Sequence, residues 1–146
     1  MTFSPPEQGS VIRYAYLWAD ELRRGHEEAR KDRPALVLTL SVRTSDDQTE
    51  LLVLAITHSP PAKPTEAVPL PPAVKRRLKL DEDASWIVTT EANAFVWPGP
   101  DIRPIPNREP RTIVYGKIPD DLLRAVARSF LVNRRRQQAR FVRRTN

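Results

Sequence analysis

Arg33 and Thr57 are a pair of residues whose types and spacing suit chemistry on a phosphate group. Arg33 comes just before the apolar run of residues 35–42, and Thr57 ends the apolar run of residues 49–57. Both runs are rich in β-branched and aliphatic residues, and a short polar segment separates them, which predicts an antiparallel hairpin. The two side chains are therefore expected at the same end of that hairpin.

The expected register sets how close these two side chains come. If the hairpin closes on its polar turn, Arg33 falls opposite His58 and Pro34 falls opposite Thr57. Opposed residues of an antiparallel pair lie about 4.5–5.5 Å apart between Cα atoms, and a slip of one or two residues keeps the pair at the same end. A guanidinium donates hydrogen bonds in a planar fork that matches phosphate oxygens, and a hydroxyl beside it adds another donor. The alternative is that Arg33 forms an ion pair with Asp32 or another acid and that Thr57 only ends a strand.

Other patterns in the sequence predict the elements that hold this hairpin in place. Proline removes a backbone donor and restricts φ, so the proline-rich residues 59–72 predict an extended loop. The residues Pro119-Asp-Asp open a helix whose apolar residues recur at helical spacing. The further expected elements are strands at 11–18, 86–90, 95–97, 102–105 and 112–117, a helical turn at 19–24 and a helix at 72–80. Together they predict an α+β fold in which a C-terminal helix covers a small curled sheet or barrel of five to seven mostly antiparallel strands.

The composition of the 146-residue chain excludes several classes of site. It has no cysteine, which excludes disulfides and thiolate chemistry, and its two histidines are too few for a zinc cluster of their own. Its four scattered glycines form no phosphate-binding loop, so we expect neither a metal nor a cofactor. The longest apolar run has six residues, and the N-terminus lacks the layout of a secretory signal. A soluble cytoplasmic protein with no membrane partner is therefore expected.

The net charge of +6 comes from the last residues of the chain. Residues 1–133 hold equal numbers of basic and acidic side chains, whereas residues 134–146 hold six arginines and no acid. This distribution predicts a flexible leader at 1–8, one domain at 9–133 and a basic, arginine-rich tail at 134–146. Arginines that neutralise phosphates release condensed counterions, so the tail indicates a nucleic-acid partner. The alternative is a solvated terminus that only aids solubility.

Four short motifs follow one another in an order that resembles a known family. They are GSVIRY at 9–14, GHE at 25–27, RPALVL at 33–38 and AIT at 55–57. In this order and spacing, followed by an amphipathic helix, they resemble the PemK/MazF-like toxins of bacterial type II toxin–antitoxin modules. The resemblance covers most of residues 9–132.

This resemblance implies a fold, an activity and partners. The implied fold is a small SH3-like barrel that forms a homodimer. The implied activity is metal-independent cleavage of single-stranded RNA, by attack of a ribose 2′-hydroxyl on the adjacent phosphate. The products are a 2′,3′-cyclic phosphate and a free 5′-hydroxyl, and a small cognate antitoxin protein neutralises the enzyme.

The resemblance assigns the chemistry to Arg33 and Thr57, and the residue types supply the other candidates. Arg33 would stabilise the negative charge that develops on the phosphate, and Thr57 would donate a hydrogen bond to it. Glu27 and His58 are two candidates for the base that takes the 2′-proton, since arginine stays protonated. The residues expected to contact RNA are Lys31, Arg134, Arg135, Arg136 and Trp97.

Several alternatives stay open at the level of sequence. Trp97, Trp86 and Tyr115 either stack on unpaired bases or belong to the core. The whole domain is either an endoribonuclease or a barrel of the same fold that binds nucleic acid or protein without cutting it. Inhibition of a topoisomerase, as implied by some relatives of the fold, is a third possibility.

Overall fold

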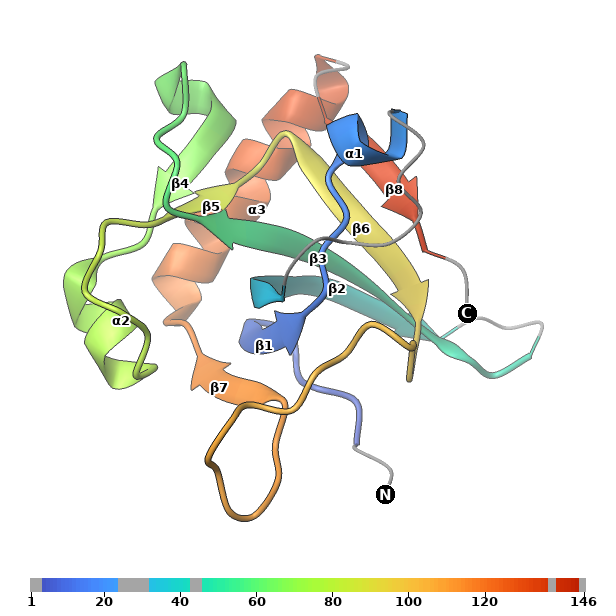
Figure 1. The fold of residues 1–146 in the computed structure, drawn as a ribbon. Helices are drawn as coiled ribbons and strands as arrows, with labels where there is room; N and C mark the ends of the chain where they lie inside the picture. Colours follow the sequence, from blue (N-terminus) through green and yellow to red (C-terminus); the bar gives the residue numbers. More distant parts are fainter. Residues whose placement is uncertain (1–3, 24–31, 43–45, 137–138, 145–146) are drawn as a thin grey trace.

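A computed structural model describes residues 4–23, 32–42, 46–136 and 139–144 of the chain (Figure 1). The described residues form these elements in chain order: β1 (Ser10–Tyr14), α1 (Ala19–Arg23), β2 (Arg33–Val42), β3 (Thr49–Thr57), the 3₁₀ turn η1 (Pro64–Glu66), β4 (Ala67–Pro69), α2 (Pro72–Arg77), β5 (Trp86–Val88), β6 (Glu91–Val96), β7 (Val114–Lys117), α3 (Asp120–Arg135) and β8 (Arg140–Arg143).

The eight strands form one sheet that stays open. Its main path runs β4–β5–β3–β2–β1–β7, with β6 paired to β3 and β8 paired to β6. All pairs are antiparallel except β6 with β8. The predicted α+β class, the mostly antiparallel sheet and the C-terminal helix are confirmed, but the strand number exceeds the expected five to seven.

Strand β3 connects the two parts of this sheet. Residues Glu50–Val53 of β3 pair with β6, whereas Ile56 and Thr57 pair with β5. The strands β5 and β6 follow one another in the chain and share the same edge of β3. The end of β3 that carries Thr57 therefore lies beside β5 and, one strand further out, β4 (Figure 1).

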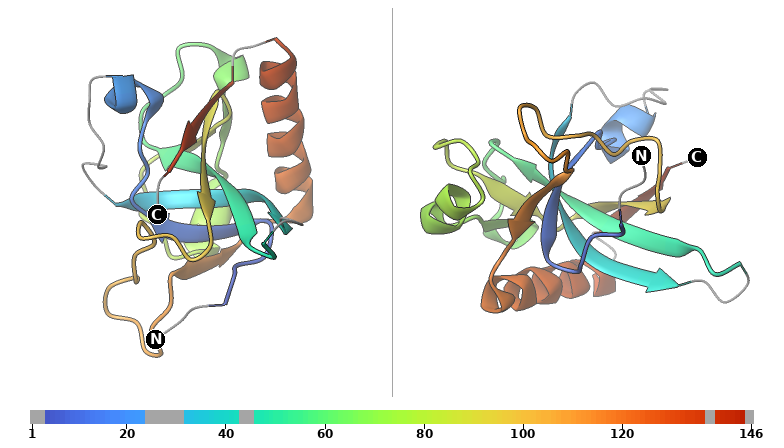
Figure 2. Two further views of the ribbon diagram at one scale, coloured as in Figure 1. Left: turned by 90° about the vertical axis from the view of Figure 1, so that its right-hand side faces the viewer. Right: turned by 90° about the horizontal axis from the view of Figure 1, so that it is seen from below.

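Both faces of the central hairpin are buried, which explains its continuous apolar sequence. Leu36 packs in a core with Phe130 of α3. The residue before it, Ala35, lies on the other face of the strand and packs in a second core with Phe95. Successive side chains of a strand point to opposite faces, so covering both faces requires an unbroken apolar run. In the left view of Figure 2, α3 lies along one side of the sheet and α1 lies on the other.

Helix α3 begins where its sequence predicts. Pro119 caps its N-terminus, and two acids follow in the first turn, where they complement the helix dipole. Val126 and Phe130 are buried against the sheet, whereas Leu131, which belongs to the predicted apolar stripe, is 49% exposed. The helix continues to Arg135, past the expected domain boundary at residue 133.

The C-terminal residues take part in the sheet instead of forming a separate tail. Strand β8 pairs in parallel with β6, and its Val142 is buried. The Arg144 side chain is 5% exposed and forms an ion pair of 2.9 Å with Asp101. The charge pattern concealed this because Phe141-Val142 is too short an apolar run to mark a strand among arginines.

The expected leader also packs against the sheet where the structure describes it. Gln8 donates a side-chain hydrogen bond to the Leu38 carbonyl, and Glu7 forms an ion pair of 2.9 Å with Lys117. Gly9 then opens β1 with a φ of +88°, a region that favours glycine. The C-terminal end of residues 4–8 is therefore anchored to the sheet.

None of the helices formed by the described residues is long and apolar enough to cross a membrane.

Candidate functional site

An open pocket of about 590 Å³ lies at the end of the central hairpin where β2 begins and β3 ends. It contains both residues of the predicted pair, Arg33 and Thr57. The residues that line it are Trp18, Asp32, Arg33, Pro34, Ile56, Thr57, His58, Ser59, Asp81 and Val88. We call this cavity the hairpin pocket.

A β-bulge brings Arg33 and Thr57 closer than the sequence predicted. The hairpin closes with Val42 opposite Thr49, but the register shifts by one residue between Val37 and Thr39. A shift of one residue moves side chains to the other face of a sheet. Beyond the bulge Ala35 pairs with Ala55, and the same register two residues further along each strand sets Arg33 opposite Thr57.

The predicted pairing of Arg33 with His58 is therefore wrong by one residue. An extra residue in β2 cannot be detected from the sequence where successive positions on both faces of the strand are apolar, as they are in residues 35–38. Its effect is that the guanidinium and the hydroxyl lie on the same face of the sheet, in the hairpin pocket.

The Arg33 guanidinium is only partly satisfied by its surroundings. Its Cζ lies 4.9 Å from the centroid of the Trp18 ring, a cation–π contact. Its Nε is buried, and no acceptor among the described residues lies within hydrogen-bond distance of it. Burial lowers the pKa of Arg33, while the charges of Glu21 and Tyr16 oppose that shift. This atom has almost no accessible surface, so a ligand in the pocket would meet the rest of the guanidinium instead.

Asp32 is not the partner of Arg33, contrary to the alternative that the sequence left open. Its carboxylate forms ion pairs of 3.4 Å with Arg13 and 3.6 Å with Arg103. Among the described residues, no carboxylate forms an ion pair with Arg33. The guanidinium is thus available on the side that faces the pocket.

Thr57 is oriented by the chain that follows it. Its Oγ1 accepts a hydrogen bond of 3.2 Å from the backbone nitrogen of Ser59. This bond uses an oxygen lone pair and leaves the hydroxyl proton free to donate. Thr57 therefore presents a donor to the same pocket as Arg33.

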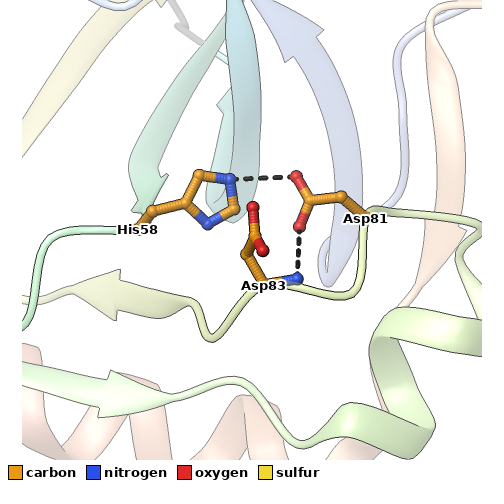
Figure 3. Close-up of side chains that lie close together, drawn as sticks. All are labelled: His58, Asp81 and Asp83. Atoms are coloured by element: carbon orange, nitrogen blue, oxygen red, sulfur yellow. Dashed lines mark hydrogen bonds and ion pairs between the residues drawn. The ribbon is translucent and has the colours of Figure 1, made fainter.

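His58 lies in the pocket, but both nitrogens of its ring have partners (Figure 3). Its Nε2 lies 2.9 Å from Oδ2 of Asp81, and its Nδ1 lies 3.1 Å from both the Ala84 carbonyl and the Ser85 hydroxyl. Which of the latter two bonds Nδ1 makes depends on the tautomer. His58 would have to release one of these bonds to exchange a proton with a substrate.

A buried lysine holds the aspartate that contacts His58. Lys75 of α2 is 4% exposed, and its Nζ donates to Oδ1 of Asp81 and to the Ser85 hydroxyl, each at 2.6 Å, and to the Asp83 carbonyl. All three ammonium protons therefore have acceptors. Burial raises the pKa of Asp81, but the hydrogen bonds and charges of Lys75 and His58 outweigh it and lower that pKa.

His58, Asp81 and Asp83 also form a group with metal-ligand chemistry. Their nearest donor atoms all lie within 4.8 Å of one another (Figure 3). However, Asp81 uses one oxygen for Lys75 and the other for His58. A cation would have to displace both contacts beside a fixed ammonium, so internal ion pairs account for this cluster better than a metal centre does.

The other predicted site residues lie elsewhere. Glu27 and Lys31 fall outside the described residues. Arg134, Arg135 and Arg136 are exposed at the end of α3; Arg134 stacks on Phe141, and Arg136 lines a separate polar cavity of about 610 Å³. These two cavities share no lining residue among those described.

Trp97 lies at the opposite end of β3 from the hairpin pocket. Its backbone nitrogen donates a bond of 2.8 Å to the carbonyl of Thr49, the first residue of β3. Thr57 ends the same strand, about 26 Å away at the usual rise per residue. Trp97 therefore does not belong to the pocket that holds Arg33 and Thr57.

Three residues of the site had no signal in the sequence. Trp18 stacks on Arg33, and Asp81 and Lys75 form the ion-pair network beneath His58. Trp18 and Asp81 lie well apart in the chain from Arg33 and His58, the residues that they contact. Lys75 belongs to a short helix that follows several prolines, and nothing in that pattern distinguishes it from an exposed lysine until the fold buries it.

A scan against protein-family models found no match to this chain, and neither did a search of curated proteins.

Proposed function

We propose that this protein is a metal-independent endoribonuclease that cleaves single-stranded RNA, acting as the toxin of a toxin–antitoxin module. In the proposed reaction a ribose 2′-hydroxyl attacks the adjacent phosphorus, and the bond from that phosphorus to the 5′-oxygen of the next nucleotide breaks. The products are a 2′,3′-cyclic phosphate and a 5′-hydroxyl.

The observation that carries this proposal is the pairing of Arg33 and Thr57 in one open pocket. Arg33 lines the pocket, stacks on Trp18 and forms no ion pair among the described residues, and the Thr57 hydroxyl has a free proton. Phosphate oxygens can accept hydrogen bonds from both side chains. The phosphorus gains negative charge in the transition state, and a guanidinium already fixed on Trp18 stabilises that charge without reorganising.

Glu27 and His58 are the two candidates for the base in this proposal. His58 lies in the pocket, and imidazole is the side chain that most often serves as a general base. Its ring is oriented by Asp81, which in turn is held by Lys75. In the tautomer whose Nε2–H donates to Asp81, Nδ1 accepts from the Ser85 hydroxyl, and it acts as the base once it exchanges that bond for one to the substrate.

The proposal also includes an SH3-like barrel as the scaffold, a homodimer and a cognate antitoxin. The mostly antiparallel sheet, in which β3 pairs on one edge with both β5 and β6, supports the scaffold. Leu40 and Val42, at the hairpin end, are 39% and 62% exposed and offer apolar surface to a second chain.

One observation favours a second candidate function, a barrel that binds nucleic acid without cutting it. Both nitrogens of His58 are engaged by protein groups. Asp32 and Asp81, the carboxylates that line the pocket, are engaged in ion pairs. Such a protein would bind phosphate through Arg33 and Thr57 and stop there.

RNA cleavage in EDTA separates these two functions. The purified protein is incubated with a long single-stranded RNA, and the fragments are tested for 5′-hydroxyl ends by direct labelling with polynucleotide kinase. Arg33→Ala and Thr57→Ala should each lower the cleavage rate about 10²–10³-fold, because each removes a donor to the developing charge. Arg128→Ala and Thr39→Ala, which change exposed residues outside the pocket, are the matched controls.

Fragments with 5′-hydroxyl ends that disappear in the two pocket variants, but not in the controls, support the endoribonuclease. Circular dichroism must show that the variants remain folded. Intact RNA that wild type and pocket variants bind equally well would exclude both functions at this pocket. Intact RNA whose binding depends on Arg33 and Thr57 would favour the binding protein.

A further inference from the structure

A tryptophan lies directly across the sheet from Thr57. Trp86 of β5 pairs with Thr57 of β3, and on its other side it pairs with Pro69 of β4. Directly opposed residues of antiparallel strands carry their side chains on the same face, with Cβ atoms about 4.5–5.5 Å apart. The strands β3, β5 and β4 are neighbours in this order (Figure 1). The hydroxyl, the indole and the proline ring therefore form one row across them.

This row belongs to the face that bears the hairpin pocket. Ile56 and Ile87, which alternate with Thr57 and Trp86, point into the core shared with α3. Val88 follows Trp86 by two residues and lines the hairpin pocket. The indole is thus on the pocket side of the sheet, next to the strand that presents Thr57.

Trp86 lines two cavities, and the larger of them shares a lining residue with this pocket. One, of about 520 Å³, is bounded by Trp86, Pro69, Pro72 and Asp81; Asp81 also lines the hairpin pocket. The other, of about 380 Å³, places Trp86 beside Pro61 and Pro64. Prolines of residues 59–72, which were predicted to form an extended loop, therefore lie beside the indole of Trp86.

Lys75 in the larger cavity is paired with other groups of its lining, since it donates to Asp81, Ser85 and the Asp83 carbonyl. Arg76 and Glu82, which also line this cavity, are exposed. The indole and the proline rings offer flat apolar faces beside these polar groups. Such a lining suits an unpaired planar base, because base–aromatic stacking needs no hydrogen-bond pattern.

We infer that Trp86 is the stacking platform for a base that neighbours the phosphate held by Arg33 and Thr57. The inference rests on the proposed function for the position of that phosphate. The ligand is a single-stranded nucleic-acid segment, since a base in a duplex is already stacked on both sides. Trp86 thereby replaces Trp97 as the aromatic contact at the site.

The test uses a ligand that cannot be cut. A short fluorescein-labelled single-stranded oligodeoxynucleotide lacks the attacking 2′-hydroxyl, and its affinity is measured by fluorescence anisotropy. Trp86→Ala and Trp86→Leu should weaken binding about 5- to 150-fold, the range for loss of one base–aromatic stack. Trp86→Phe keeps a flat ring and should retain most of the affinity, and Trp97→Phe is the matched control.

A scan of abasic positions locates the stack. Removing one base at a time should weaken wild-type binding at a single position, and that loss should vanish in Trp86→Leu, which has no stack to lose. Trp86→Leu keeps an apolar side chain in the sheet, so it remains informative if Trp86→Ala fails to fold. Equal affinities for wild type and Trp86→Leu, or no binding by the wild type, would overturn the inference.

The outcome separates this inference from the proposed function. If RNA is cleaved through Arg33 and Thr57 while Trp86→Leu binds normally, the stacking subsite is wrong and the endoribonuclease stands. The other case is that RNA stays intact while the affinity lost on removing one base is lost only in the wild type and not in Trp86→Leu. In that case the subsite stands and the catalytic proposal fails.

Discussion

Arg33 and Arg144 show two ways in which this fold holds a packed guanidinium. Arg144 is 5% exposed; it forms an ion pair with Asp101 and donates to the Ala15 carbonyl at 2.6 Å. Arg33 stacks on Trp18, and its buried Nε has no acceptor among the described residues. The first arginine is satisfied by the protein. The second lines an open pocket and has no ion pair among the described residues, as the proposed phosphate contact requires.

The largest expected effect is on stability, and it should fall on only one of these arginines. Arg144→Ala leaves the mostly buried carboxylate of Asp101 without its partner and should lower the free energy of unfolding by about 3–5 kcal/mol. Arg33→Ala removes a cation that has no ion pair among the described residues. It should change the free energy of unfolding by less than about 1 kcal/mol. Urea denaturation followed by circular dichroism measures both values.

Arg144→Lys serves as the control for this contrast, because it keeps the charge but loses the fork of donors and should lie between wild type and Arg144→Ala. Equal losses in Arg33→Ala and Arg144→Ala would contradict the division into a structural and a ligand-binding guanidinium.

An intermediate effect is expected at Lys75, a third packed cation that resembles Arg144 in being fully satisfied. Lys75→Met leaves Asp81, Ser85 and the Asp83 carbonyl without their shared donor, and it should lower the free energy of unfolding by about 2 kcal/mol. The measurement is again urea denaturation, at neutral pH and then at decreasing pH.

The pH dependence of the free energy of unfolding tests whether Lys75→Met loses stability through its contact with Asp81. Lys75 and His58 hold the pKa of Asp81 below its usual 3.8, so its carboxylate stabilises the fold above that pH and loses this contribution as the pH falls further. The gap between wild type and Lys75→Met should therefore narrow below about pH 3.8. In an Asp81→Asn background the gap should change little with pH. A gap that stays constant in both backgrounds would exclude Asp81 as the partner that matters.

The smallest effect on stability is expected for the exposed arginines at the end of α3. Changing Arg134, Arg135 and Arg136 together to glutamine should alter the free energy of unfolding by only about 0.5 kcal/mol. If all three contact a single-stranded RNA, the slope of log affinity against log salt should fall by about 2. An unchanged slope would remove them from the RNA interface.

This triple variant is a better test than truncating residues 134–146. Truncation also deletes β8, with its buried Val142, and the ion pair of Arg144 with Asp101. A loss of binding after truncation would then report unfolding as readily as lost phosphate contacts.

Local patterns were sufficient to predict the central hairpin and the long helix. The runs of residues 35–42 and 49–57 flank a short polar turn, and β2 and β3 pair there with Val42 opposite Thr49. Pro119 and the acids after it mark the start of α3 within a residue. The interactions that specify these elements join residues close in sequence, so spacing alone reports them.

Strands β4 and β8 were not predicted, for opposite reasons. Strand β4 contains a proline and follows a proline-rich loop, yet it pairs at the edge of the sheet, where a missing donor is tolerated. Strand β8 lies among arginines, and its parallel partner β6 is distant in the chain. An edge strand with few apolar residues has no period to detect.

The amino-acid sequence was enough to place a guanidinium and a hydroxyl at one end of a hairpin, because turn, strand and alternation are properties of neighbouring residues. The fold was needed for their exact opposition, which depends on a bulge between Val37 and Thr39, and for the row that joins Thr57 to Trp86. It was also needed to separate Arg33 from Arg144, whose acceptor at Ala15 lies 129 residues away. Whether a packed charge is satisfied depends on what the rest of the chain brings to it, and no local pattern carries that information.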